Sequence, residues 1–280
     1  FSHWLGVLPA PLFDTQRAAA LLGLGAGQSY RALVAHFFDI ELPKDETQSD
    51  WLQRPLTAAQ AQYAAQDVTY LHPMGVQLLN QAMERHRLEW ILEEGARLRP
   101  GGKPPIAKFK TAYRLPPEQQ RVLAEVVDWR EGEARHRDRP RSWILNDKIV
   151  TGVARSVPRS VRELAAVEDM PQGLVRRAGD ELVARIVAAA DTDSDQSPAM
   201  ILKPLASEQR GLVSVLSERL KQIAESLDIP AEVLMPKADL EHLVREQMNP
   251  SLAAPENWSG WRADTVVVPL RQSLKERAAS

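Results

Sequence analysis

Apolar residues recur every three to four positions along most of the chain, which predicts a mainly α-helical protein. In the first hundred residues the pattern predicts a helix that Asp14 or Thr15 caps, and a helix that Ser29 caps. A third helix follows Thr57. The apolar run over 68–83 continues from it, and Pro73 either kinks this run or starts a new helix. One more helix is predicted over 87–98, and the short apolar pair Leu12-Phe13 is the candidate strand.

Proline, glycine and polar clusters divide the chain into three parts. Residues 99–115 and 191–204 have the composition of linkers, the second of them acidic. Between them, helices are predicted from Pro116-Pro117, around 146–155 and 160–166, and over 172–190. After the second linker, helices are predicted around 212–227 and 239–248, and a last one carries Val267 and Leu274. The predicted domains are therefore 1–98, 116–190 and 205–280.

The helix that follows Thr57 carries the most informative side chains. Thr57 and Gln60 form a capping-box pattern, and the following alanines favour helix. Tyr63 and Asp67 are four residues apart, so they share one face of that helix. A carboxylate is a hard oxygen ligand for Mg²⁺ or Mn²⁺, and a neighbouring phenol can orient a water for attack on a phosphodiester. The alternative is a half-buried ring beside a solvated charge.

Composition excludes several classes of protein. The chain has no cysteine, so neither a disulfide framework nor thiolate chemistry is expected. No run of 18 apolar residues is present, so no contact with a membrane is expected. The net charge of -2 argues against a uniformly basic nucleic-acid binder, but residues 101–190 hold 17 Lys+Arg against 12 Asp+Glu. The middle part alone therefore has a positive balance that would attract phosphates.

An ordered set of residues carries a family resemblance over about 1–98. It consists of Lys44, Ser49-Asp50-Trp51, Arg54-Pro55-Leu56, Gln60 and Tyr63-Ala64-Ala65-Gln66-Asp67. This set resembles the third exonuclease motif of the ribonuclease D family, in the DEDD subgroup that has Tyr four residues before Asp. The resemblance implies the C-terminal part of an α/β ribonuclease H-like exonuclease domain. It also implies that Asp67 is a metal ligand and that Tyr63 positions the attacking water.

The resemblance implies two divalent ions, Mg²⁺ or Mn²⁺, held by four acidic residues. The first two acids of the family lie in a D-x-E motif and the third lies in a motif that would fall before Phe1. The sequence lacks these three and opens on Phe. We therefore expect the chain to be the C-terminal part of a longer protein, and the 280 residues alone to be inactive.

Candidate RNA contacts lie in the loop before the helix that follows Thr57 and in the middle part of the chain, 101–190. Lys44 and Arg54 are suited to phosphates, whereas Trp51 either stacks on a base or anchors the loop. The pattern P-P-E-Q-Q, W-R-E and R-P-R-S-W-I-L-N-D resembles the helicase-and-RNase-D C-terminal (HRDC) domain, a small helical module that binds nucleic acid. Within it Arg137, Arg139 and Arg141 either contact phosphates or form a solvated basic loop. Residues 205–280 are expected to form a second, HRDC-like domain with a structural role.

These observations predict a mainly α protein in which part of an exonuclease domain precedes two helical HRDC-type domains. The resemblance implies a 3′–5′ exoribonuclease that acts on tRNA precursors and on structured RNA with a single-stranded 3′ end, as a cytoplasmic monomer. The alternatives are a non-catalytic RNA-binding adaptor built on HRDC domains and part of a helicase. The helicase is the weaker one, because no Walker motif is present.

Overall fold

The computed structural model describes residues 7, 10–43, 46, 49–98, 104–192 and 201–278. Regular structure in these ranges is helical, and no strand occurs in them, which confirms the mainly α prediction. The chain forms two compact units, one made of 1–100 with 205–280 and the other of 101–204. None of the helices in the described ranges combines the length and apolar character that a membrane crossing requires.

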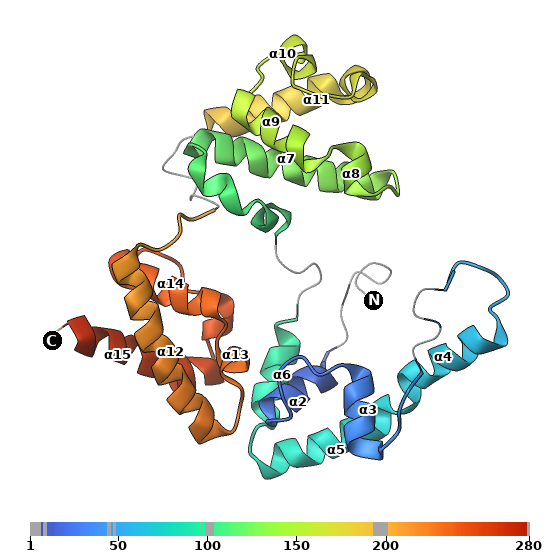
Figure 1. Cartoon of the computed structure of the whole chain (residues 1–280), viewed down its shortest axis with the longest axis vertical. Helices are drawn as coiled ribbons and strands as arrows, with labels where there is room; N and C mark the ends of the chain where they lie inside the picture. The colour runs from blue at the N-terminus through green and yellow to red at the C-terminus, as the bar shows by residue number, and fades with distance from the viewer. Residues whose placement is uncertain are drawn as a thin grey trace. The chain divides into compact units, whose positions relative to one another are not determined.

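Local caps position the helices of the first hundred residues (Figure 1). These helices are α2 (Thr15–Leu21), α3 (Tyr30–Phe38), α4 (Ala58–Thr69), α5 (Leu71–Glu84) and α6 (Leu88–Ala96). The Asp14 carboxylate accepts the N–H groups of Gln16 and Arg17, and the Ser29 hydroxyl accepts that of Ala32. Both predicted caps are therefore confirmed, and each satisfies donors that the first turn of a helix leaves open.

Residues 205–278 supply the other half of the first unit. The elements are α12 (Ser207–Leu227), α13 (Ala231–Leu234), α14 (Lys237–Met248), η4 (Glu256–Trp258), η5 (Ala263–Val267) and α15 (Val268–Ala278). One apolar core joins them to the first hundred residues: Leu78 and Ile91 belong to the same cluster as Leu216, Leu243 and Leu270. The rings of Trp90 and Trp261 stack across this junction, with centroids 4.5 Å apart.

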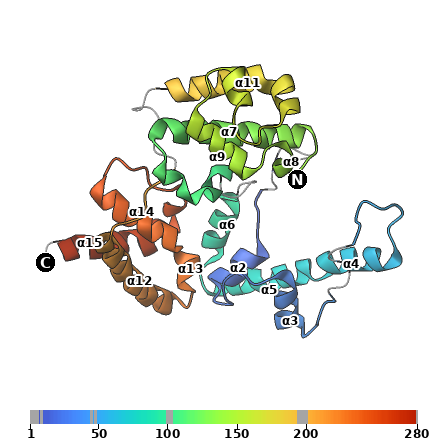
Figure 2. The ribbon, with the colours of Figure 1, turned by 45° about the horizontal axis from the view of Figure 1, so that its top comes forward.

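The second unit has a separate core. Its elements are η1 (Pro105–Lys108), η2 (Lys110–Arg114), α7 (Pro117–His136), α8 (Arg141–Ile144), α9 (Asp147–Ser156), α10 (Val161–Ala165) and α11 (Gln172–Asp191). Helix α7 packs against both α9 and α11 (Figures 1 and 2). Val126 of α7, Val153 of α9 and Ile186 of α11 are fully buried there. This core forms without residues of the first unit.

Two details of the expected elements are settled by the structure. The candidate strand at Leu12-Phe13 is wrong, because this segment runs against α6 rather than against a strand. The backbone approaches Gly95 so closely that a Cβ there would lie 1.8 Å from the carbonyl oxygen of Leu12. Pro73 lies in the first turn of α5 and so starts a new helix, since a first turn does not need its N–H.

The division into domains at 98, 116, 190 and 205 stays a prediction. The shared core agrees with the structural role expected of residues 205–280.

Candidate functional site

Tyr63 and Asp67 line one small hollow of about 180 Å³. Helix α4 contributes Tyr63, Gln66 and Asp67 to its wall, and the start of α3 contributes Ser29, Tyr30 and Arg31, with Leu42 and Pro43 completing it. The capping box fixes the start of α4: the Gln60 N–H donates to Thr57 Oγ1 at 3.1 Å, and the Thr57 N–H donates to Gln60 Oε1 at 3.0 Å. The helix therefore places a phenol and a carboxylate in one concave site.

The loop before α4 packs against Tyr63. The rings of Trp51 and Tyr63 lie 5.8 Å apart, tilted by 51°. The half-buried Trp51 indole donates to the Glu46 carbonyl oxygen at 3.1 Å. Gln60 also donates to the carbonyl oxygen of Asp50. These contacts give Trp51 the features of a loop anchor; its role in stacking on RNA stays a prediction.

Arg54 and Lys44 are the other two candidate RNA contacts of this loop. Arg54 is exposed, and its guanidinium donates to the carbonyl oxygens of Trp51 and Gln53. Lys44 lies outside the described residues. Arg54 is therefore near Tyr63 in the sequence, and its guanidinium contacts the backbone of its own loop.

Tyr30 is a residue of the site that the sequence did not single out. Its hydroxyl donates to the carbonyl oxygen of Gln66 at 2.9 Å and accepts the N–H of Tyr70 at 3.2 Å. Burial raises the pKa of Tyr30, the hydrogen bond from Tyr70 opposes this, and the negative charge of Asp67 raises it further. Tyr30 therefore ties the start of α3 to the end of α4 beside Asp67.

Arg31 is the second residue that was missed. Its side chain lines the hollow, and its guanidinium donates to the Pro43 carbonyl oxygen. Tyr30 and Arg31 follow the Ser29 cap and lie more than 25 positions before α4, so no local signal in the sequence links them to that helix.

The donor set of the hollow suits one ligand position for a divalent ion. The Asp67 side chain is exposed and offers hard oxygen donors. Within the described ranges no three side chains of His, Asp or Glu lie close enough to hold a metal ion together. Asp67 therefore fits as a single ligand, and the described residues by themselves do not complete a metal site.

The candidate arginines of the second unit lie at the end of α7 and the start of α8. Arg137 pairs with Glu133 at 2.6 Å, and Arg141 pairs with Glu131 at 3.1 Å. The guanidinium of Arg139 lies 5.7 Å from the centre of the Trp143 ring. Arg139 and Arg141 line a common surface hollow, whereas Arg137 is not in its wall. The structure thus brings two of the three predicted arginines together.

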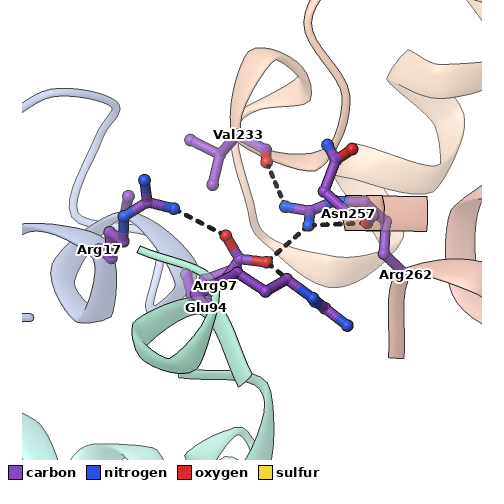
Figure 3. A pocket seen from close by; sticks show the side chains of 8 residues that line it. Arg17, Glu94, Arg97, Val233, Asn257 and Arg262 are labelled. Atoms are coloured by element: carbon purple, nitrogen blue, oxygen red, sulfur yellow. Dashed lines mark hydrogen bonds and ion pairs between the residues drawn. The ribbon is translucent and has the colours of Figure 1, made fainter. Parts of the chain in front are cut away.

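A larger cavity, of about 360 Å³, lies in the first unit and is held by ion pairs (Figure 3). Glu94 of α6 contacts Arg17 at 2.9 Å and Arg262 at 2.6 Å. The buried Arg262 also donates to the carbonyl oxygens of Val233, Leu234 and Asn257. Arg17 and Arg262 come from the two different chain segments, and both pair with the Glu94 carboxylate. We therefore assign this cavity a structural role at the junction of the segments and not a catalytic one.

Comparison with known proteins finds the two families that the sequence resembles. Residues 1–83 match a family model described as a 3′–5′ exonuclease, and residues 119–186 match the HRDC domain. Ribonuclease D of Pseudomonas paraeruginosa is 38% identical over 98% of this chain and 75% of its own length. Ribonuclease D of Xanthomonas oryzae pv. oryzae is 34% identical over 96% of this chain and 74% of its own length.

A solved structure agrees. That of Escherichia coli RNase D, described as an exoribonuclease involved in structured RNA processing, matches with a TM-score of 0.79 and 28% identity. It covers 99% of this chain and 76% of the solved one. These likenesses favour an enzyme over a non-catalytic adaptor. The chain belongs to the ribonuclease D family of 3′–5′ exoribonucleases.

Proposed function

We propose that Tyr63 and Asp67 are catalytic residues of this exoribonuclease. One observation supports the proposal: α4 places both side chains in the same hollow, beside a loop that packs on Tyr63. A capping box fixes one end of α4 and Tyr30 fixes the other. Catalytic side chains must be held rigidly in position, and the contacts at both ends of α4 provide this support.

Each of the two residues has a separate role. Exonucleases of this family generally depend on divalent metal ions, which activate water and stabilise the leaving oxygen when bound. Asp67 supplies a carboxylate ligand to such an ion, and Mg²⁺ or Mn²⁺ suits its oxygen atoms. The Tyr63 hydroxyl orients the attacking water by hydrogen bonding. Trp51 holds the Tyr63 ring in place through their contact.

Membership of the ribonuclease D family and the HRDC match imply that the protein binds RNA. We propose as substrates tRNA precursors and structured RNA with a single-stranded 3′ end. Candidate contacts to this RNA are Lys44, Trp51, Arg54, Arg137, Arg139 and Arg141. We also propose that the protein is a monomer and that it acts in the cytoplasm, where it can reach such RNA.

The test is a nuclease assay on the gene product that contains residues 1–280. A 5′-labelled RNA with a single-stranded 3′ end is incubated with Mg²⁺, and shortening from the 3′ end is followed on a gel. Asp67→Asn and Tyr63→Phe should each lower the rate by roughly 100-fold or more, since each removes a group that acts on the reacting water.

Two matched controls carry the same chemical change elsewhere. Asp39→Asn removes a carboxylate from an exposed left-handed position that asparagine tolerates, and Tyr113→Phe removes a phenol in the second unit. Both should keep at least half of the activity. Full activity in Asp67→Asn would overturn the assignment.

A further inference from the structure

Trp143 is the tryptophan whose side chain is most exposed in the described part of the chain. Its relative exposure is 71%, whereas Trp129, Trp258 and Trp261 are buried and Trp51 and Trp90 are half-buried. A large aromatic ring normally gains most from burial. An exposed ring on a well-packed unit is available for contact with another molecule, and its surroundings decide which kind.

The backbone around Trp143 holds the ring outward. The Trp143 N–H donates to the Pro140 carbonyl oxygen at 2.8 Å, and the next two residues, Ile144 and Leu145, are buried. The Leu145 carbonyl oxygen accepts a hydrogen bond from the fully buried Arg130. The segment is thus anchored on both sides of Trp143, and the ring is presented by a rigid element rather than by a loose loop.

One cation lies beside the ring, and further arginines lie in the hollow that Arg139 lines. The guanidinium of Arg139 lies 5.7 Å from the centre of the Trp143 ring, within range of a cation–π contact. Arg135, Arg139 and Arg141 line an adjacent hollow of about 500 Å³, together with Glu131 and Asp138. Glu131 pairs with Arg141, whereas Arg139 has no ion pair with a carboxylate of the described residues. The Arg139 charge is therefore available to a phosphate.

We propose that Trp143 and Arg139 form an RNA subsite, in which a base stacks on the indole and Arg139 contacts the neighbouring phosphate. The inference rests on the proposed RNA-directed function. Single-stranded nucleic acid binds where aromatic rings alternate with cations, because every base has a stacking face and every nucleotide a phosphate. The hollow beside Arg139 holds Arg135, Arg139 and Arg141 against Glu131 and Asp138, so charge complementarity favours a polyanion such as RNA.

Binding of a labelled oligonucleotide tests this subsite without catalysis. Fluorescence anisotropy of a 5′-labelled single-stranded RNA is measured with the full chain in EDTA, which removes divalent ions. Trp143→Ala should weaken binding by about 5-fold or more, as the loss of one stacked base does. Trp143→Phe should restore most of the affinity, whereas Trp143→Leu, which is apolar without a ring, should not. Circular dichroism confirms that each variant is folded.

The salt dependence separates the two contributions. Arg139→Ala should lower the slope of log affinity against log salt, whereas Trp143→Ala should leave that slope unchanged. The control is Arg219→Ala, which removes one exposed arginine from α12 in the first unit.

Two results would overturn the subsite: unchanged affinity in Trp143→Ala, or equal affinity in the Leu and Phe variants. Failure here is distinct from failure of the catalytic proposal. Binding is measured without metal, and Asp67→Asn tests turnover alone.

Discussion

Tyr30 shows how one hydroxyl can fix the position of the Asp67 carboxylate, which we propose to be catalytic. It bonds to Gln66 at the end of α4 and to Tyr70 at the break before α5. Asp67 lies between these two partners in the chain. A shift of the last turn of α4 would therefore move the carboxylate, and a small misplacement of a reacting group costs much of its effect.

Replacing this hydroxyl should affect both stability and rate. Tyr30→Phe should lower the free energy of unfolding by about 1 kcal/mol, since two hydrogen bonds are lost, and should lower exonuclease activity several-fold. Urea unfolding and the 3′-shortening assay measure the two effects. Tyr113→Phe is the control, because the Tyr113 hydroxyl bonds only the neighbouring Arg114 among the contacts described. Unchanged activity in Tyr30→Phe would show that Asp67 holds its position without it.

At the scale of elements, one ion pair joins α7 to α9. Arg130 of α7 is fully buried, and its Nη1 bonds the Asp147 carboxylate at 2.7 Å. Lys108 contacts the same carboxylate at 2.9 Å. Burial alone would raise the pKa of Asp147, but hydrogen bonds from Arg130 and Lys108 outweigh it and lower the pKa below its usual value.

The sign of the pH dependence follows from this lowered pKa. A carboxyl with a lower pKa in the folded state stabilises the fold above its unfolded pKa, and this contribution is lost as the pH falls through the folded value. Asp147→Asn should therefore destabilise the second unit by about 1–2 kcal/mol at pH 7, a range that allows for the half-exposed carboxylate. The difference from the unchanged protein should shrink as the pH falls below the ordinary pKa of an aspartate, about 3.9.

Urea unfolding at pH 7 and at low pH measures this difference. Asp180→Asn, an exposed position on α11, is the control and should be neutral at both values. A destabilisation by Asp147→Asn that is equal at both pH values would contradict the role of the charge.

In the first unit, two segments far apart in sequence share one core. Arg87 and Arg85 of the first segment reach the end of α12, where Arg87 bonds the Leu227 carbonyl oxygen and Arg85 bonds Asp228. Arg262 contributes the buried cation opposite Glu94. Breaking a buried pair is costly because the remaining charge loses its partner.

Glu94→Ala should therefore destabilise the first unit by about 3 kcal/mol. Hydrogen exchange followed by mass spectrometry should show faster exchange in α2, α6 and α12–α15, with α7–α11 unchanged, because the second unit has its own core. Glu84→Ala, an exposed position on α5, should change neither. Faster exchange spread equally over both units would contradict two independent cores.

Local signals in the sequence predicted local structure well. The caps at Asp14, Ser29 and Thr57 depend on neighbours within three residues, and each was read from the sequence. The spacing of Tyr63 and Asp67 likewise predicted one face. Contacts between distant residues left no such signal: Tyr30 lies 36 positions from Gln66, and Glu94 lies 168 positions from Arg262. The sequence did not predict Trp143 as a contact residue, because the apolar pattern does not distinguish an exposed ring from its buried neighbours Ile144 and Leu145.

The shared core has a genetic consequence. None of the residues lining the hollow at Tyr63 comes from 205–280, yet this stretch covers Leu78 and Ile91. A premature stop codon after the second unit would therefore leave the proposed catalytic residues Tyr63 and Asp67 encoded, but would remove the residues that share a core with Leu78 and Ile91. Substitutions that cost activity should therefore also arise within 205–280, away from the hollow that holds Tyr63 and Asp67.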